Sequence, residues 1–424
     1  NLRQAQTAIF ARNIFYDNFN IFPTRLTFFA PNDGNIIFEF PLIHFLTALT
    51  YKLFPISEIN GRIVNLLFYI FNGFLFFKIQ KLIFKNYIAT ITSSLYISSP
   101  LILYLGHAYM PETSMMTFYL FAYYFFIKNK LIPDKKNETL MFITLAIGPL
   151  LKPPAGILFF PIFIDYLEEL NFKEIVKKSL PFFICALPLF FWMIYGDLVN
   201  SSEFSSGSNW NWINILFGKG SLIGTWIDIN FYKNILFNFL VQHLNPLTFL
   251  LSIYGILFGF RSKNKITEFH YNWLFTNLLF LFIFAGANKG HPYYQIFFIP
   301  NLIFFIGLAF TNIDKSNINK KFIIYFSVFL NLFLSISIFI YGSSEKIRIS
   351  NVNEFKKVVS NNIEINKKLP TEYILYSHKG LASPPVYTYY ADSYSKLYSV
   401  ESEDLYNLKN EIQKGAKYIF FINT

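Results

Sequence analysis

The sequence predicts an α-helical polytopic membrane protein with about ten or more spanning helices, followed by a small α/β domain. Three observations predict this fold class. Of the 424 residues, 54% are hydrophobic and only 14% are charged, against about 25% charged in an ordinary soluble domain. Long apolar runs alternate with short lysine clusters, the pattern of a chain that crosses a membrane repeatedly. After Gly342 the composition changes abruptly toward Lys, Glu, Asn and Ser.

Five basic clusters mark the loops that we expect on the cytoplasmic side, because such loops carry an excess of Lys and Arg. They also explain the formal net charge of +11, so this charge does not indicate nucleic-acid binding. The clusters are Lys78, Lys81 and Lys85; Lys128, Lys130, Lys135 and Lys136; Lys173, Lys177 and Lys178; Arg261, Lys263 and Lys265; and Lys315, Lys320 and Lys321.

Apolar segments run out and back between successive clusters, with one more segment before the first cluster and one after the last. We expect 139–151 and 154–167 to be broken or tilted helices, because they are short and lie beside prolines. The expected spans are 61–77, 87–106, 113–127, 139–151, 154–167, 180–196, 236–260, 270–287, 292–311 and 322–342.

This topology places the unusual residues of the chain on the extracytoplasmic side. We expect the first loop, residues 1–60, to fold on the membrane surface, because it is long and carries few charges. The other outside parts are the turns around Pro111, Lys152 and Gly290, the stretch 197–235 and the tail from 343.

The tail reads as a soluble extracytoplasmic domain of the α/β type. Its apolar residues predict a helix over 351–366, a strand over 372–376, a helix over 403–414 and, after Gly415, a closing strand over 416–421. We therefore divide the chain into a transmembrane domain, 1–342, and a soluble domain, 343–424.

The chain begins at Asn1 with neither a methionine nor a hydrophobic leader. We expect a first spanning helix to precede this sequence. Any active-site residues on that helix would then be absent from the sequence.

Several common catalytic signatures are absent: the sequence has no glycine-rich phosphate loop, no HExxH, no CxxC and no D-x-D motif. Nucleotide chemistry is therefore not indicated, and neither is a metal or another cofactor. What remains is a set of acidic and basic residues beside prolines on the outside loops. The acids are Asp33, Glu39 and Glu112, and the basic residues are Arg3, Arg12, Lys152 and His291.

An ordered series of segments carries a family resemblance over most of the chain. The series is RQAQTA from Arg3, EFPL from Glu39, GRIVNLLF from Gly61, GHAYMPETSMM from Gly106, LLKPPAGILFFP from Leu150 and HPYYQIFFIP from His291. It resembles the polytopic glycosyltransferases of GT-C architecture, and within them the protein mannosyltransferase and aminoarabinose transferase group, which uses polyprenyl-phosphate sugars. No single motif is highly specific, but the ordered set is.

The resemblance implies roles for particular residues. In that group a carboxylate of the first outside loop is the catalytic base, which here is Glu39 or Asp33, and a Pro-acid pair in the next outside loop assists it, which here is Pro111-Glu112. The sequence departs from the group in two ways. The Asp-Glu pair at the start of the first loop is not seen, and Phe40 stands where some members carry a phosphate-binding lysine.

The chemistry of the residues agrees with the resemblance. Sugar transfer from a lipid phosphate needs a carboxylate that takes the proton of the acceptor hydroxyl, and cations or hydrogen-bond donors that hold the phosphate. Glu39 or Glu112 can supply the first function. We expect the phosphate-binding wall to comprise Arg3, Arg12, Lys152, His291, Tyr293 and Gln295.

Each residue also has a structural interpretation. Glu39 can cap a helix that starts near Pro41, and Glu112 can interact with a helix dipole. Lys152 can extend along apolar surface to the membrane interface, and His291 can belong to an interfacial aromatic belt. The other histidines have no metal-ligand spacing, so we interpret them as structural: His44, His107, His243 and His270.

The sequence thus predicts a multi-pass glycosyltransferase of the inner (plasma) membrane. It would move a sugar from a polyprenyl-phosphate carrier to a lipid-linked glycan, a lipopolysaccharide-type acceptor or a protein on the outer face. Two alternatives are a transporter or flippase of lipid-linked glycans and an O-antigen ligase or polymerase-like enzyme. The first would place ionisable residues in mid-membrane, where the predicted spans carry almost no charge. The second would rely on outside Arg and His, whereas this chain has acids in its first two outside loops.

Overall fold

A computed structural model gives the fold of the chain. The structure describes residues 2–22, 24–25, 35–167, 172–199, 222–262, 264–314, 319–342, 374–377, 397–399 and 419–422.

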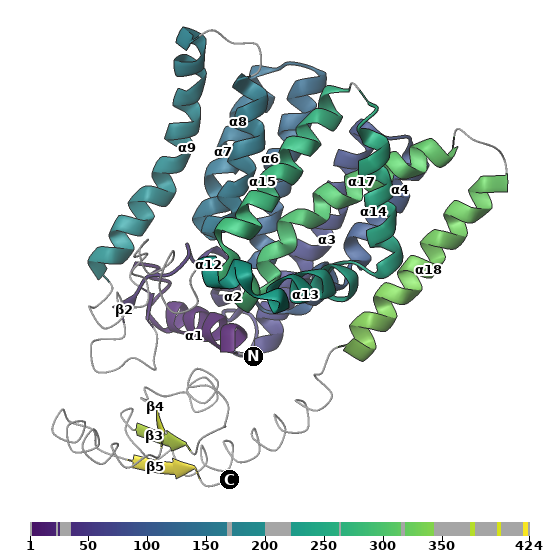
Figure 1. Ribbon diagram of the computed structural model, residues 1–424. Helices are drawn as coiled ribbons and strands as arrows, with labels where there is room; N and C mark the ends of the chain where they lie inside the picture. Colours follow the sequence, from purple (N-terminus) through teal and green to yellow (C-terminus); the bar gives the residue numbers. More distant parts are fainter. Residues whose placement is uncertain are drawn as a thin grey trace.

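A bundle of long helices forms the main body (Figure 1), with most of its helices running between the same two ends. The first half of the bundle comprises α3 (Glu58–Ile83), α4 (Asn86–Ser98), α5 (Pro100–His107), α6 (Glu112–Leu131), α7 (Lys135–Leu151), α8 (Phe159–Leu167) and α9 (Phe172–Val199). The second half comprises α14 (Pro246–Gly259), α15 (Lys265–Ile283), α17 (Phe298–Asp314) and α18 (Asn319–Gly342).

Shorter elements gather at one end of the bundle. Figure 1 shows α1, α2, α12 and α13 at this end, near the N-terminus. This arrangement agrees with a first loop that folds against the surface of the membrane. The elements are α1 (Leu2–Tyr16), α2 (Leu42–Thr50), α12 (Leu222–Ile227), α13 (Ile229–Phe237), α16 (Ala285–Gly290) and the antiparallel strands β1 (Thr24–Arg25) and β2 (Asn35–Ile36).

Each of the predicted apolar segments coincides with a helix or with consecutive helices. By length and hydropathy, three helices of the described residues can cross a membrane, or up to five if each bent pair is counted as one span. The three are Glu58–Ile83, Glu174–Val199 and Pro292–Ile313. The helical membrane fold is therefore confirmed, while the expected number of about ten spans stays a prediction.

Two expected spans are bent. The segment 87–106 bends by 60° between α4 and α5, and 236–260 bends by 108° between the π-helical turn η3 (Asn238–His243) and α14. In both places a proline begins the second helix, and the residue before a proline is disfavoured in helical conformation. Asn245 then caps α14, because its side chain accepts a hydrogen bond from the Thr248 amide.

The break predicted near Lys152 is present. α7 ends at Leu151, Lys152 is extended with φ −158° and ψ 114°, and a 3-10 helix, η2 (Pro153–Leu158), leads into α8. A similar turn, η4 (Pro292–Phe297), leads into α17. Both turns begin with a proline, and a basic residue precedes each of them, Lys152 before η2 and His291 before η4.

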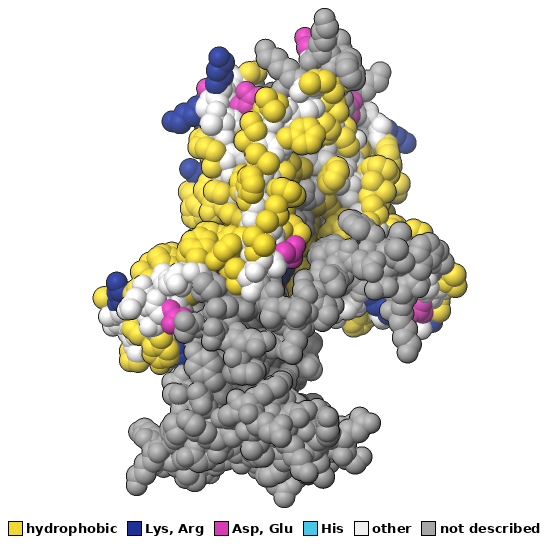
Figure 2. All heavy atoms as spheres, turned by 90° about the vertical axis from the view of Figure 1, so that its left-hand side faces the viewer, with side chains coloured by type: hydrophobic (Ala, Val, Ile, Leu, Met, Phe, Trp, Pro, Cys, Tyr) yellow, Lys and Arg dark blue, Asp and Glu magenta, His cyan; other side chains and the backbone are white. Residues whose placement is uncertain are grey.

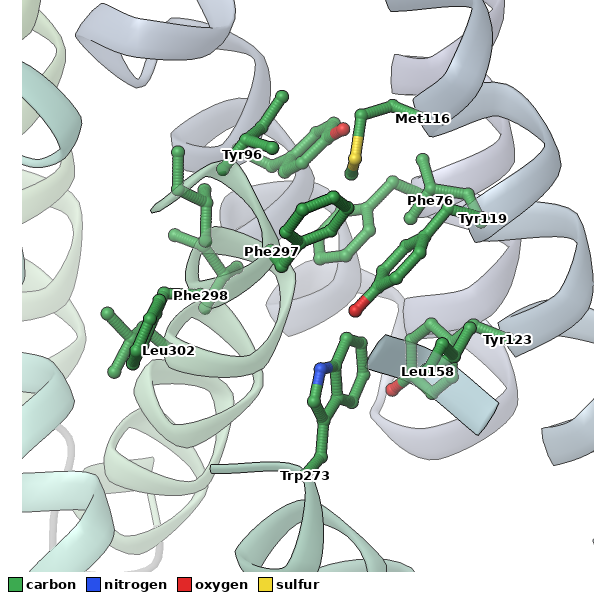
Figure 3. Close-up of a cluster of buried hydrophobic side chains, with 14 of the residues drawn as sticks. Phe76, Tyr96, Met116, Tyr119, Tyr123, Leu158, Trp273, Phe297, Phe298 and Leu302 are labelled. Carbon is green, nitrogen blue, oxygen red and sulfur yellow. The ribbon is translucent and has the colours of Figure 1, made fainter. Parts of the chain in front are cut away.

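Aromatic packing joins the two halves of the bundle (Figure 3). Tyr119 of α6 lies between Phe297 and Trp273, with ring centroids 5.1 and 5.8 Å away, and Phe76 stacks on Tyr96 at 4.2 Å. Because lipid tails are as apolar as these rings, van der Waals packing rather than the hydrophobic effect favours such contacts within a membrane.

Close backbone approach adds to this packing. A Cβ atom added at Gly255 of α14 would lie 1.8 Å from the carbonyl oxygen of Phe305 in α17. Small residues at helix contacts allow such an approach in membrane proteins. Any larger residue at Gly255 would force these two helices apart.

The outer surface of the bundle is apolar. Phe183 and Phe191 of α9 are 70% and 61% exposed, and Phe322 and Phe329 of α18 are 74% and 67% exposed. Figure 2 shows apolar side chains over the side of the bundle that faces the viewer, with Lys and Arg near its upper end. Such a surface fits contact with lipid.

The described part of the tail is a three-stranded parallel sheet with the order β4-β3-β5. Its strands are β3 (Ile374–Ser377), β4 (Leu397–Ser399) and β5 (Ile419–Ile422). β3 and β5 overlap the strands expected at 372–376 and 416–421. The helices expected at 351–366 and 403–414 lie outside the described residues, so the α/β domain stays a prediction.

Candidate active site

Four charged side chains from separate segments meet at the end of the bundle that carries α1. Arg3 of α1 forms an ion pair with Glu39, which precedes α2. Lys152, which follows α7, forms an ion pair with Glu112 at the start of α6. The Lys152 Nζ also lies 3.7 Å from Oε1 of Glu39. We call these residues the four-charge cluster; their charges alternate in the order Arg3, Glu39, Lys152, Glu112.

The four-charge cluster is largely shielded from solvent. The side chains of Arg3 and Glu39 are 24% and 13% exposed, and those of Lys152 and Glu112 are 5% and 1% exposed. Burying a charge is costly unless it is paired, and two cations here balance two anions. Removal of one member would therefore leave a buried charge without its partner.

The backbone fixes Glu39 from both sides. The amide of Phe40 donates to the Leu150 carbonyl at 3.1 Å, and the indole of Trp192 donates to the Phe38 carbonyl at 2.7 Å. Glu39 is thus held between the end of α7 and the last turns of α9. Phe40 therefore contributes a backbone hydrogen bond here and no charge.

Lys152 has its position because α7 cannot continue through Pro153 and Pro154. Its ammonium group lies over two aromatic rings, 5.2 Å from the centroid of Tyr293 and 5.5 Å from that of Tyr294. A cation over an aromatic face is stabilised by the ring quadrupole. The lysine therefore contacts both acids of the cluster and both tyrosines of η4.

Glu112 is the most deeply buried acid of the cluster. It is the first residue of α6, where the helix dipole favours a negative charge. Its Oε1 atom pairs with Lys152, and its Oε2 atom has no hydrogen-bond partner among the described residues. Within the described residues, the hydrogen bonding of this buried carboxylate therefore depends on Lys152.

Electrostatics keep Glu39 ionised. Burial alone would raise the pKa of Glu39, but the opposite charges of Arg3 and Lys152 outweigh it and lower the pKa from 4.5 to about 2. For Arg3, burial acts to lower the pKa, yet the attraction of Glu39 and Glu112 raises it further above its ordinary value. Both groups therefore carry full charge at neutral pH.

His291 lies near the four-charge cluster but is not a cation at neutral pH. Its ring centroid is 5.3 Å from that of Tyr293 and 5.5 Å from that of Tyr294. Burial, followed by the positive charges of Lys152 and Arg3, lowers its pKa below 6.5. His291 can thus offer a neutral N–H donor to a ligand beside Lys152.

Other predicted site residues lie elsewhere. Gln295 is fully buried, with its Oε1 2.7 Å from Nε2 of His243 and its Nε2 donating to the Asn288 carbonyl at 3.2 Å. Arg12 is also buried, and its charge acts on Tyr51. Asp33 lies outside the described residues.

Two residues near the cluster were not predicted as site residues. Tyr294 supplies the second ring over Lys152, and its position directly after Tyr293 could have indicated this. His44 interacts electrostatically with Glu39, and burial lowers its pKa to about 4. Its Nδ1 atom has no hydrogen-bond partner within the described part of the chain. His44 was interpreted as structural, and no spacing signal distinguished it.

The described residues contain no group of three or more His, Cys, Asp or Glu side chains arranged to hold a metal ion.

This fold is the GT-C fold of polytopic membrane glycosyltransferases, and the resemblance noted in the sequence is confirmed. Residues 39–195 match the model of the dolichyl-phosphate-mannose-protein mannosyltransferase family. That match includes Glu39, Glu112 and Lys152 of the four-charge cluster. No curated protein matches the chain by sequence.

Solved structures of the same fold include ArnT from Cupriavidus metallidurans, in an undecaprenyl phosphate complex and in the apo state. The TM-scores are 0.65 and 0.63, each at 12% identity, over 98% of this chain and 85% and 84% of those chains. An oligosaccharyltransferase from Archaeoglobus fulgidus, in complex with Zn and sulfate, matches with a TM-score of 0.60 at 11% identity. That match covers 92% of this chain and 58% of the other.

Proposed function

We propose that this protein is an integral membrane glycosyltransferase that takes its sugar from a polyprenyl-phosphate carrier. Transfer would occur on the extracytoplasmic side of the inner (plasma) membrane, to a lipid-linked glycan, a lipopolysaccharide-type acceptor or a protein. The observation that carries the proposal is the buried four-charge cluster at one end of an apolar bundle. The fold shared with ArnT, which was solved with undecaprenyl phosphate, supports the choice of carrier.

Arg3 and Lys152 would bind the phosphate of the donor. A phosphate linked to both a lipid and a sugar carries one negative charge, and a second develops on it as the sugar leaves. Two fixed cations in a shielded site stabilise this developing charge more than they stabilise the bound donor. His291 would add a neutral N–H donor on the same side.

Glu39 would act as the base. In the absence of substrate its low pKa makes it a weak base, because Arg3 and Lys152 both pair with it. A bound phosphate would compete for these two cations and so raise the basicity of the carboxylate. Binding of the donor would thereby prepare the base, while Glu112 keeps Lys152 in place through its Oε1 atom.

The reaction is a single displacement at the anomeric carbon of the sugar. The acceptor oxygen forms a bond to this carbon, and the bond from the carbon to the phosphate oxygen breaks. The proton of the acceptor hydroxyl passes to the carboxylate base. The products are the glycosylated acceptor and polyprenyl phosphate, and no oxidant, reductant or nucleotide is consumed.

The test is an assay of the purified full chain with polyprenyl-phosphate sugars and a lipid extract as the source of acceptors. We expect polyprenyl phosphate to be released together with labelled acceptor. A flippase would move the donor across a bilayer without releasing polyprenyl phosphate. A ligase or polymerase acting on a diphosphate-linked glycan would release polyprenyl diphosphate instead, and either result would contradict the proposal.

A further inference from the structure

The second outside turn, which positions Glu112, is held by side chains of a neighbouring helix. This turn joins the end of α5 to the start of α6. The last carbonyl groups of a helix lack partners within the helix, and an unpaired carbonyl is costly where water is scarce. Two donors of α3, Asn65 and Arg62, bind carbonyls at the end of α5, and the Thr113 hydroxyl of α6 also donates to the Leu105 carbonyl at 2.8 Å.

Asn65 of α3 is the central donor. Its Nδ2 atom donates to the Leu105 carbonyl at 2.6 Å, to the Ala108 carbonyl and to the Thr113 hydroxyl at 3.2 Å. Because two of these partners are carbonyls, which only accept, the amide must present its NH₂ group to the turn. Asn65 is fully buried, so water does not compete for these contacts.

Asn72 of α3 makes a second set of hydrogen bonds to α6. It lies seven residues after Asn65, on the same face of α3, and donates to the Thr113 carbonyl at 2.9 Å. The Thr117 hydroxyl in turn donates to Oδ1 of Asn72 at 2.7 Å. Thr113 is thus fixed through its carbonyl by Asn72 and through its hydroxyl by Asn65.

The turn is also joined to α1. The Tyr109 amide donates to Oε1 of Gln4 at 3.4 Å, and Gln4 is the next residue after Arg3. Arg62 of α3 donates to the His107 carbonyl at 3.3 Å. The segment that carries Glu112 therefore contacts both α3 and the helix that carries the other end of the four-charge cluster.

We propose that Asn65 is a positioning residue for Glu112: it joins the end of α5 to the first turn of α6 and so holds the Glu112 carboxylate against Lys152. Asn65 touches neither Lys152 nor Glu39 in any contact of the described residues, and it acts through the backbone on either side of Glu112. Its catalytic effect rests on the proposed function, whereas its effect on the turn does not.

The experiment compares Asn65→Leu with Asn301→Leu in the full chain. Leucine is close in size to asparagine but lacks the amide. Asn301 is a matched control, because it is also fully buried and donates to a backbone carbonyl, that of His270 at 3.2 Å, away from the turn. The first readout is hydrogen–deuterium exchange of peptides covering residues 105–117, which needs no activity.

We expect Asn65→Leu, but not Asn301→Leu, to increase exchange in 105–117. In the transfer assay we expect kcat to fall by about 10- to 100-fold, the range for a displaced catalytic group. The decisive readout is the same substitution made in Glu112→Gln. If Asn65 acts through Glu112, Asn65→Leu should lower kcat by less than about twofold in the Glu112→Gln variant. The two substitutions would then remove the same contribution to kcat.

Three results would overturn the proposal: unchanged exchange in 105–117, a loss of kcat equal to that of Asn301→Leu, or a full additional loss in the Glu112→Gln background. If Asn65→Leu does not fold, Asn65→Ala makes the same test, since it also removes the amide that donates to the turn. If the wild type transfers no sugar, the proposed function fails, and exchange alone decides whether Asn65 holds the turn.

Discussion

Lys152 joins two acids that lie far apart in the sequence: its Nζ pairs with Glu112 and lies 3.7 Å from Oε1 of Glu39. One lysine therefore couples the segment before α2 to the start of α6. Phe40 stands where some members of the glycosyltransferase group that the sequence resembles carry a lysine. In this chain Lys152, from a different segment, places a cation beside Glu39.

Replacement of Glu39 by glutamine tests the base. Glutamine keeps the shape but cannot accept a proton at neutral pH, so we expect turnover to fall by about 10²-fold or more, the usual effect of losing general-base catalysis. The measurement is release of polyprenyl phosphate, with normal expression and an unchanged elution profile as controls. If Glu39→Gln turns over normally while Asp33→Asn is inactive, Asp33 is the base. If Glu39→Gln, Asp33→Asn and Glu112→Gln all retain activity, the account of the base is wrong.

Tyr293 supplies an aromatic face to Lys152, so the donor half-saturation constant should depend on the ring rather than on the hydroxyl. We expect Tyr293→Phe to keep the donor half-saturation constant within about twofold, and Tyr293→Leu to raise it by several-fold, in line with about 1 kcal/mol for a partly shielded cation–π contact. Titration of the donor in the transfer assay measures both. Equal constants for the two variants would remove Tyr293 from the site.

Acid should destabilise the protein through Glu39. A carboxyl group whose pKa is lowered on folding stabilises the folded state above its unfolded pKa, and this contribution is lost as the pH falls through the folded pKa. The pKa of Glu39 falls from 4.5 to about 2. We therefore expect the unfolding temperature in detergent to decline between about pH 4.5 and pH 2. The decline should be shallower in Glu39→Gln, and parallel curves for the two proteins would show that Glu39 is not ion-paired on folding.

The topology can be tested at the C-terminal end. If the five lysine-rich loops are cytoplasmic, the span before residue 343 must end outside. Alkaline phosphatase fused after Thr424 should therefore be active, and a reporter that works only in the cytoplasm should be silent at the same position. The reverse pattern would invert the topology and move the four-charge cluster to the cytoplasmic side.

The sequence predicted the helical segments and grouped the charged residues on one side of the membrane, because hydropathy and lysine distribution are local properties. It did not predict that Arg3, Glu39, Lys152 and Glu112 pair in one alternating cluster, since pairing depends on how distant helices pack. Gln295 shows a further limit. A 3-10 helix has three residues per turn, so Gln295 in η4 points away from Tyr293 and into the bundle, where it pairs with His243.

The most direct test of the account is the turnover of Lys152→Met compared with that of Lys130→Met in the same transfer assay. Both lysines are paired with an acid and shielded from solvent, Lys152 with Glu112 and Lys130 with Asp165, but only Lys152 belongs to the four-charge cluster. We predict that Lys152→Met lowers kcat/KM for the polyprenyl-phosphate donor by about 10²-fold or more, the range for losing one donor to a developing oxyanion, while Lys130→Met stays within about threefold of the wild type. Equal activity of the two variants would contradict the claim that sugar transfer takes place at this cluster.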